Sequence, residues 1–259
     1  MFFKYLKIFD INNTKIRLGP TNDGGYVVSK EHSINLTNVV SFGIDNNIDF
    51  EIKFNQIFKP KNILLYDHTI NKLPRKTKFF FLKKGLSSEK NFLFTTLHDI
   101  TKNFKDNKNF LKIDIEYDEF KVFDNVDMEV LKKFSQIVCE FHFIFLDKDD
   151  VNSKKNLTPY FEKFMISNYE KINILLAEYY ERVLKKINKN FIPFHMHSNN
   201  SLPLKKIFGK NLPQLIEISF LRKDLVKKKK LSLSKYPIDG LDFPNKPYKK
   251  DLTNFYPFS

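Results

Sequence analysis

The stretch FLKIDIEYDEF, residues 110–120, places four acidic side chains directly behind an apolar run: Asp114, Glu116, Asp118 and Glu119. Side chains alternate between the two faces of a strand, so Asp114 and Glu116 are expected on one face and the isoleucines on the other. Two carboxylates on a buried strand are costly unless they meet cations or hydrogen-bond donors. The stretch therefore predicts a local negative site in a chain whose formal charge is +14.

Two further apolar runs end in polar side chains. QIVCEFH, residues 136–142, places Glu140 and His142 on one face, again two positions apart. FHMHSNN ends in His197 and two asparagines, and directs more polar groups towards the same edge if the runs form one sheet. Any one of these side chains is equally well explained as a helix cap or as a partner of lysine. Their combination favours a functional site.

Ligands of open parallel sheets bind outside the carboxyl ends of the strands, so glycines and acids there are informative. SFGIDNNIDFE places Gly43 where the backbone has to approach a ligand, and LLYDHT contains Asp67 about 20 residues later. An acid at that spacing accepts hydrogen bonds from both hydroxyls of a ribose. In KKGLSS, Gly85 permits a close turn, and Ser87 or Ser88 is placed to meet an adenine edge. A tight turn at Gly43 and an N-cap at Asp67 are the alternatives, so the prediction rests on the pair.

Seven short apolar runs separated by helical stretches are expected to position these side chains. The predicted strands are residues 39–44, 62–68, 78–86, 110–116, 136–142, 191–198 and 215–223, and the predicted helices are residues 50–58, 91–104, 117–134 and 155–188. Buried strands that alternate with amphipathic helices indicate a parallel α/β sheet.

A chain of 259 residues with 42% hydrophobic content is long enough to bury a large core. No Pro-, Gly- or Ser-rich linker and no internal repeat interrupts it. We therefore predict one domain over residues 1–259, with an N-terminal extension over residues 1–35, a core over residues 36–223 and a tail over residues 224–259. The tail is rich in proline and aromatic residues, and we expect it to pack on the core because exposed aromatics are costly.

The excess of 44 Lys+Arg over 30 Asp+Glu does not by itself identify an anionic partner. The lysines are spread along the chain and the densest run spans only residues 227–230, so the charge is only weak support for a nucleic-acid partner. Cys139 is the only cysteine, which excludes an intrachain disulfide and a thiolate zinc site. The N-terminus lacks the features of a signal peptide, and no run of about 18 apolar residues is present to span a membrane. We predict a soluble cytoplasmic protein.

The order of the motifs along the chain carries a resemblance. From about Arg17 to Asn245, the chain is similar to the FkbM-related, methyltransferase-like family of S-adenosylmethionine-dependent O-methyltransferases. The motifs that together carry this similarity are IRLGPTNDGGYVV, SFGIDNNIDFE, YDH, GLSS, LKIDIEYDEF, QIVCEFHF, HMHSNN, IEISFLRKD and PIDGLDFPN. The resemblance implies a Rossmann-like class I methyltransferase fold: an α/β fold with a seven-stranded, mainly parallel sheet, an antiparallel last strand and helices on both faces. Two places depart from the family pattern, namely Asp45 and Asn46 where a second small residue is usual, and Tyr117 where glycine is common.

The resemblance also implies roles for individual residues. The residues that would line the methionine and ribose side of the cofactor are Phe42, Gly43 and Asp45; those for the ribose diol and the adenine are Asp67, His68, Leu86 and Ser87. Asp114 is implied beside the methionine moiety and the transferred methyl group. Gly25 and Tyr26, in the DGGY segment, are implied to fold over the cofactor, with a simple hairpin turn as the alternative.

A methyltransferase has to align the acceptor oxygen behind the sulfonium methyl group and remove its proton. A buried carboxylate or histidine does this, so the candidate catalytic residues are His142, Glu140, Asp114 and His197, with His142 and Glu140 ranked ahead of His197. Oxygen and imidazole ligands of this kind also hold Mg²⁺ or Mn²⁺, which makes Asp114, Glu140 and His142 the candidate metal ligands.

The resulting hypothesis is an O-methyltransferase that uses S-adenosylmethionine and acts on a sugar hydroxyl, in a nucleotide-linked sugar or a surface polysaccharide. The predicted partner is a small-molecule or glycan acceptor, and no particular oligomeric state is predicted. One alternative is an RNA methyltransferase, which the charge favours but which lacks an Asn/Asp-Pro-Pro-aromatic motif. The other is a non-catalytic nucleic-acid-binding protein on a degenerate Rossmann core.

Overall fold

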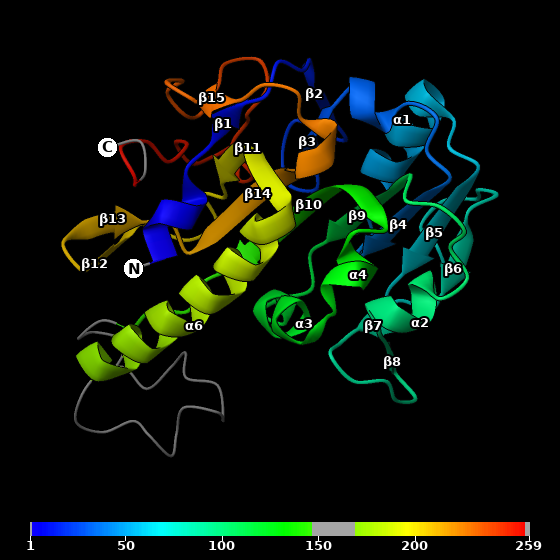
Figure 1. Ribbon diagram of the computed structural model, residues 1–259, viewed down its shortest axis with the longest axis horizontal. Helices are drawn as coiled ribbons and strands as arrows, with labels where there is room; N and C mark the ends of the chain where they lie inside the picture. Colours follow the sequence, from blue (N-terminus) through cyan, green and yellow to red (C-terminus); the bar gives the residue numbers. More distant parts are fainter. Residues whose placement is uncertain (1, 147–168, 257–259) are drawn as a thin grey trace.

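A seven-stranded sheet forms the centre of the computed structural model, which describes residues 2–146 and 169–256 (Figure 1). Its strands, in spatial order, are β11 (Phe191–Ser198), β14 (Leu215–Arg222), β10 (Phe134–His142), β9 (Asn109–Ile113), β4 (Asn38–Phe42), β5 (Asn62–Tyr66) and β6 (Phe80–Leu82). β10, β9, β4, β5 and β6 pair in parallel, and β14 lies antiparallel between β10 and β11. The prediction of a mainly parallel sheet with an antiparallel last strand is confirmed.

The strand order reverses between β4 and β9. From β4 the chain adds β5 and β6 on one side, and it then returns to add β9 and β10 on the other. In β4, Phe42 lies opposite both Tyr66 of β5 and Ile113 of β9. The loops that leave these strands diverge in opposite directions, which opens a crevice for a ligand at their carboxyl ends.

Two predicted strands are shorter in the structure. The run predicted over residues 110–116 ends at Ile113, because the chain then turns through Glu116 and Tyr117, whose backbone φ angles are 55° and 77°. Asp114 and Glu116 therefore do not alternate along one strand, and that prediction is wrong. The run predicted over residues 78–86 is divided: β6 stops at Leu82, and β7 (Gly85–Leu86) pairs with β8 (Phe94–Thr95) in a separate sheet.

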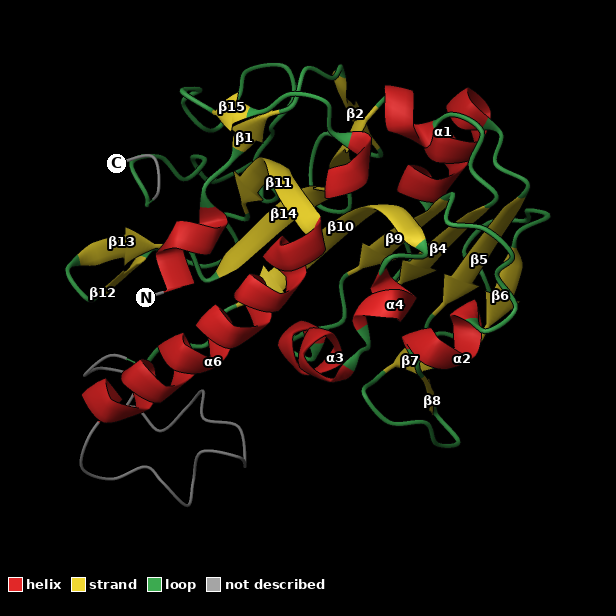
Figure 2. Ribbon diagram, in the orientation of Figure 1, coloured by secondary structure: helices red, strands yellow, loops and turns green. Residues whose placement is uncertain are grey.

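Helices cover both faces of the sheet (Figure 2). One face carries α1 (Asp49–Phe58) and the hairpin of β2 (Lys15–Leu18) and β3 (Tyr26–Ser29); the other carries the 3₁₀-helix η1 (Phe2–Leu6), α2 (Leu97–Thr101), α3 (Glu119–Asn125), α4 (Met128–Leu131) and α6 (Tyr169–Asn190). The helix predicted over residues 117–134 is split into α3 and α4, and α2 is all that is helical in the stretch 91–104. Of the helix predicted over residues 155–188, residues 155–168 lie outside the described residues.

Phenylalanine supplies most of the large buried side chains on both faces. On the α1 face, the ring of Phe54 lies 4.9 Å from that of Phe110 in β9. On the other face, the ring of Phe120 in α3 lies 4.4 Å from Tyr180 of α6 and 5.0 Å from Phe141 of β10. Such aromatic pairs bury much apolar area. These contacts pack α1 against β9 and α3 against β10, and they therefore help to fix where the ends of these strands lie.

Short strands pair in two-stranded sheets outside the central sheet. β1 (Phe9–Asp10) pairs with β15 (Lys230–Leu231), and β12 (Lys205–Ile207) pairs with β13 (Lys210–Leu212). Two further 3₁₀ turns are η2 (Glu31–Ser33) and η3 (Lys223–Leu225). Beyond β15, Tyr236 and Phe255 are buried in the largest apolar cluster. The described part of the tail thus contributes to the core, while the domain boundaries drawn from the sequence stay predictions.

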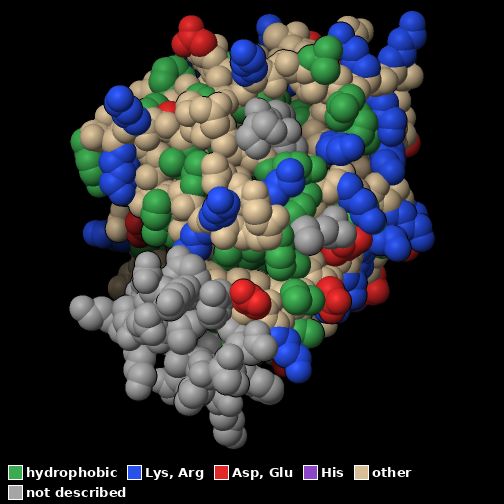
Figure 3. All heavy atoms as spheres, turned by 90° about the vertical axis from the view of Figure 1, so that its left-hand side faces the viewer, with side chains coloured by type: hydrophobic (Ala, Val, Ile, Leu, Met, Phe, Trp, Pro, Cys, Tyr) green, Lys and Arg blue, Asp and Glu red, His purple; other side chains and the backbone are tan. Residues whose placement is uncertain are grey.

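Basic side chains are prominent on the face of the molecule drawn in Figure 3. On the face drawn in Figure 3, Lys and Arg side chains stand among apolar and neutral ones. Within residues 2–146 and 169–256, no helix combines the length and the apolar character that crossing a membrane requires.

Candidate active site

A cavity of about 740 Å³ opens at the carboxyl ends of β4, β5 and β9. Its volume is in the usual range for sites that bind small molecules. The residues predicted from the sequence that line it are Tyr26, Gly43, Asp45, Asp67, His68, Leu86 and Asp114. The loops after three neighbouring strands, the start of β3 and the short strand β7 thus bring these seven residues together.

Three residues predicted to bind a cofactor do not line the cavity. Phe42 belongs to the apolar cluster on the opposite face of the sheet, where its ring stacks on Tyr66 at 4.9 Å. Ser87 follows Leu86 but is not among the residues that line the cavity. Gly25 is packed so tightly that a Cβ atom there would overlap the carbonyl oxygen of Pro20. Phe42 and Gly25 therefore pack outside the cavity, next to the lining residues Gly43, Gly24 and Tyr26.

Gly43 and Asp114 follow β4 and β9 directly and lie side by side. The amide of Asp114 donates to the carbonyl of Phe42 at 3.3 Å. A Cβ atom on Gly43 would overlap the carbonyl oxygen of Asp114, and its φ angle of +68° lies in the left-handed region. Only glycine fits both requirements. The ammonium group of Lys112 then donates to the Gly43 carbonyl at 3.0 Å.

Asp67 joins the loops that follow β4 and β5. Its Oδ2 accepts hydrogen bonds from the amides of Ile44 (3.0 Å) and Asp45 (2.9 Å), and its Oδ1 accepts from the amide and the hydroxyl of Thr69 (2.7 and 2.6 Å). Burial raises the pKa of Asp67, but the hydrogen bonds from Thr69 and the two amides outweigh it and hold the pKa below its ordinary value. Asp67 is thus an ionised anchor in the cavity wall; its contact with a ribose stays a prediction.

Asp114 receives a hydrogen bond from the N-terminal hairpin. The hydroxyl of Tyr26 donates to its Oδ2 at 2.8 Å. Burial raises the pKa of Asp114, and the charges of Lys112 and His142 together with the Tyr26 hydrogen bond oppose that rise. A carboxylate with a raised pKa at the wall of a cavity is suited to accept a proton from a bound hydroxyl.

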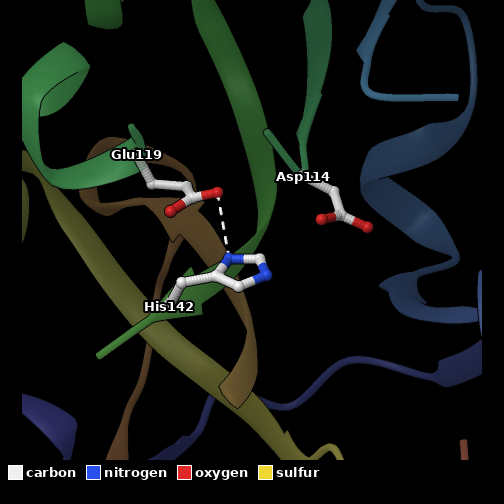
Figure 4. A group of neighbouring side chains, drawn as sticks. All are labelled: Asp114, Glu119 and His142. Atoms are coloured by element: carbon white, nitrogen blue, oxygen red, sulfur yellow. Dashed lines mark hydrogen bonds and ion pairs between the residues drawn. The ribbon is translucent and has the colours of Figure 1, made fainter. Parts of the chain in front are cut away.

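His142 lies beside Glu119 (Figure 4), and it is not among the residues that line the cavity. Its Nδ1 is 3.1 Å from Oε1 of Glu119, and its Nε2 is 3.3 Å from Oε2 of Glu116. Burial opposes a charge on the imidazole, but the two glutamates outweigh burial and raise the pKa of His142 to about 11. At neutral pH the ring is therefore an imidazolium, which donates protons and cannot accept one.

Glu119 is a candidate residue that sequence reasoning did not select. As the first residue of α3 its side chain is 0% exposed, and its Oε1 accepts from the amide of Ile115 at 2.9 Å as well as facing His142. The sequence feature that could have identified Glu119 is its place in the acid-rich stretch FLKIDIEYDEF. Its inward direction depends on the left-handed turn at Glu116 and Tyr117, which a strand pattern does not predict.

Glu140 and His197 lie on the sheet away from the cavity lining. Glu140 accepts from the side-chain amide of Asn199 at 2.8 Å, and burial, followed by the charges of Asp114 and Glu217, raises the pKa of Glu140 well above its usual range. His197 lies 3.3 Å from Glu217 and 3.2 Å from Asp251 of the tail. Burial opposes its charge, but these two acids outweigh burial and raise the pKa of His197 to about 10.

The structure brings together a set of possible metal ligands that differs from the predicted one. Asp114, Glu119 and His142 each offer one ligand atom within 4.8 Å of the others, so Glu119 stands where Glu140 was expected. A histidine binds a metal ion as the neutral imidazole. Both ring nitrogens of His142 face carboxylates in the described arrangement, so a metal ion bound there would have to replace the proton that His142 shares with one of them. Metal binding at this group stays a prediction.

The lining residues that were not selected from the sequence include Glu51, Phe94 and Lys112. The signal for Lys112 is a lysine inside the fully buried strand NFLKI. The signal for Glu51 is an acid among the buried phenylalanines of α1.

Comparisons with known proteins connect this site to a family. Residues 21–183, which are more than half of the chain, match the family model described as the methyltransferase FkbM domain. A comparison with curated proteins gave no match. One similar solved structure is a putative hemolysin from Streptococcus thermophilus, with 12% identity, a TM-score of 0.37, and coverage of 87% of this chain and 75% of that chain. Another is the plantazolicin methyltransferase BpumL in complex with a monoazolic desmethylPZN analog and SAH, with 13% identity, a TM-score of 0.30, and coverage of 72% and 76%.

Replacing Gly43 by Ala should destabilise the protein far more than the same change at Gly209. Both glycines have positive φ angles, +68° and +73°, so both variants carry a left-handed penalty of roughly 1–2 kcal/mol. Only the Gly43 variant must also displace the Asp114 carbonyl, because a Cβ atom on Gly209 meets nothing within 4 Å. Urea denaturation compares the two variants, and equal losses would contradict the described contact.

The stability that His142 contributes should depend on pH in a defined direction. Its folded-state pKa is raised from 6.5 to about 11, so this contribution is fully present below 6.5 and is lost as pH rises towards about 11. The free energy of unfolding of His142→Gln should therefore fall furthest below the wild-type value near pH 6.5, and the gap should close at higher pH. Urea titrations across this window test this, and a gap independent of pH would refute the ion-pair network.

Proposed function

Because the chain belongs to the FkbM methyltransferase family, we propose that it binds S-adenosylmethionine in the cavity and methylates a hydroxyl oxygen of a sugar. The observation that carries the proposal is the position of the cavity, at the reversal of strand order between β4 and β9, where ligands of such sheets bind. When bound, S-adenosylmethionine supplies an electrophilic methyl group on a positively charged sulfur.

The lining residues suit the nucleoside part of this cofactor. Leu86 and Phe94 offer apolar surface for an adenine, and the ring of His68 lies 4.8 Å from that of Phe94. Asp45 and Asp67 offer carboxylates to the ribose hydroxyls, since an ionised carboxylate only accepts hydrogen bonds. Asp67 also anchors the loop that presents Asp45, and its two oxygens already accept four hydrogen bonds. We therefore propose that a ribose hydroxyl shares these acceptors and that Asp67 acts mainly by shaping the subsite.

The charge of the cavity indicates the kind of acceptor. Its lining contains one lysine, Lys112, and seven acids: Asp23, Asp45, Glu51, Asp67, Asp114, Glu116 and Asp118. An excess of carboxylates attracts a sulfonium and repels phosphates. We therefore propose a neutral or amino-bearing sugar, free or within a polysaccharide, in preference to a nucleotide-linked sugar. The same charge disfavours RNA as the acceptor and a nucleic-acid-binding role.

We propose that Asp114 accepts the proton of the acceptor hydroxyl. Of the four candidate catalytic residues it is the one that lines the cavity, and its raised pKa brings it nearer to that of a useful base. His142 would act behind it, as a fixed positive charge that favours the ionised form of Asp114. This ranking replaces the one drawn from the sequence, in which His142 and Glu140 came first.

Calorimetry with S-adenosylhomocysteine tests the cofactor site. We expect the wild-type protein to bind it and Asp67→Ala to lose at least about tenfold in affinity, since a charge-assisted hydrogen bond contributes roughly 1.5–3 kcal/mol. Asp239→Ala, at an exposed position outside the cavity, is the control and should bind as the wild type does. Absence of binding by the folded wild-type protein would reject the proposed function.

Asp114→Asn should reduce turnover by roughly two to four orders of magnitude while the affinity for S-adenosylhomocysteine is kept. Wild-type activity should fall as pH drops through the Asp114 pKa, which lies above 3.8, because the protonated acid cannot act as a base. Methyl transfer from labelled S-adenosylmethionine to neutral sugars, amino sugars, nucleotide sugars and RNA provides the assay. A larger loss in Glu140→Gln or His142→Gln than in Asp114→Asn would restore the ranking drawn from the sequence.

A further inference from the structure

A buried carboxylate in the cavity wall lacks a partner. Glu51 is 1% exposed, lies on α1 and lines the cavity. Among the described residues neither of its carboxylate oxygens has a hydrogen bond of acceptable geometry, although the hydroxyl of Ser41 lies near. Burial raises the pKa of Glu51, and the charge of Lys112 opposes that rise. An unpaired buried carboxylate is destabilising by itself, which points to a ligand that supplies the missing donor.

A buried ammonium group lines the same cavity. Lys112 is 4% exposed, and the one hydrogen bond of its Nζ within the described residues goes to the carbonyl of Gly43. Its Nζ also lies over the ring of Tyr26, 5.0 Å from the centroid. An ammonium group has three donors, so this geometry leaves donors for a further acceptor. No ion pair joins Glu51 to Lys112 in the part of the chain that the structure describes, so the two charges do not satisfy each other.

We propose that Glu51 and Lys112 form a subsite for a zwitterionic α-amino acid group: the ammonium of the ligand donates to Glu51, and its carboxylate accepts from Lys112. This rests on the proposed function, because the methionine end of S-adenosylmethionine is such a group. Asp114 is less suited to the ammonium, since its Oδ2 already accepts from Tyr26. The subsite explains why a methyltransferase keeps an unpaired acid and a buried lysine on facing elements, α1 and β9.

Calorimetry with three thioether nucleosides tests the subsite. S-adenosylhomocysteine carries both charges, 5′-S-(3-carboxypropyl)-5′-thioadenosine lacks the amine, and 5′-S-(3-aminopropyl)-5′-thioadenosine lacks the carboxylate. Glu51→Gln should weaken binding of S-adenosylhomocysteine by about tenfold or more and leave the amine-free ligand unchanged. Lys112→Met should weaken S-adenosylhomocysteine similarly and leave the carboxylate-free ligand unchanged. Asp49→Asn, on the same helix in an exposed ion pair with Arg75, is the control and should change none of the three affinities.

The outcomes separate this inference from the proposed function. If the wild-type protein binds none of the three ligands, the proposed function fails. If it binds them and Glu51→Gln weakens the amine-free ligand as much as S-adenosylhomocysteine, Glu51 only supports the fold and the subsite is rejected. Should Glu51→Gln not fold, the wild-type affinities decide: loss of the ligand amine must weaken binding by about tenfold, and equal affinities would reject the subsite.

Discussion

The contact between Gly43 and the carbonyl of Asp114 is the constraint from which the candidate site is built. Parallel pairing of β4 with β9 forces these two residues together, and the missing side chain of Gly43 lets the chain turn away at that point. The turn delivers two amides to Asp67 and a carbonyl to Lys112. Three strand ends are thereby joined through main-chain geometry and a few short hydrogen bonds. Lining side chains presented in this way are fixed by the sheet itself, which is the condition for a preorganised site.

Electrostatic compensation explains how a chain of charge +14 keeps an acid-rich cavity. The acids are balanced singly: Asp67 by amides and a hydroxyl, Asp114 by Tyr26 and the charges of Lys112 and His142, and Glu119 by His142. Glu51 is the acid of the cavity wall whose two oxygens are both buried and without a hydrogen bond among the described residues. The acids of the stretch FLKIDIEYDEF thus serve two purposes. Asp114 and Glu116 line the cavity, and Glu116 and Glu119 each contact one ring nitrogen of His142.

Sequence patterns predicted what depends on strand periodicity and missed what depends on turns. Seven apolar runs gave the seven strands, and their ends gave Gly43, Asp67 and Asp114, because register aligns the carboxyl ends of parallel strands. The direction of Glu119 was out of reach, because it follows from positive φ angles at Glu116 and Tyr117, where most side chains are disfavoured. Tyr117 occupies the position where the family pattern has glycine, so the departure noted in the sequence coincides with the backbone conformation that glycine suits best.

The remaining errors arise where irregular chain covers the sheet. His197 and Glu140 lie outside the cavity lining, and His197 contacts Asp251 of the tail. The tail also acts on the cavity wall itself, since Asn245 donates to Glu217 at 2.8 Å and to Asp23, a lining residue, at 3.2 Å. The tail is rich in proline and has no helix or strand periodicity, so the sequence pattern could not predict these contacts. The family match ends at residue 183, yet Asn245 hydrogen-bonds Asp23 in the loop beside the cavity. The position of this lining loop therefore depends on a residue outside the matched part of the chain.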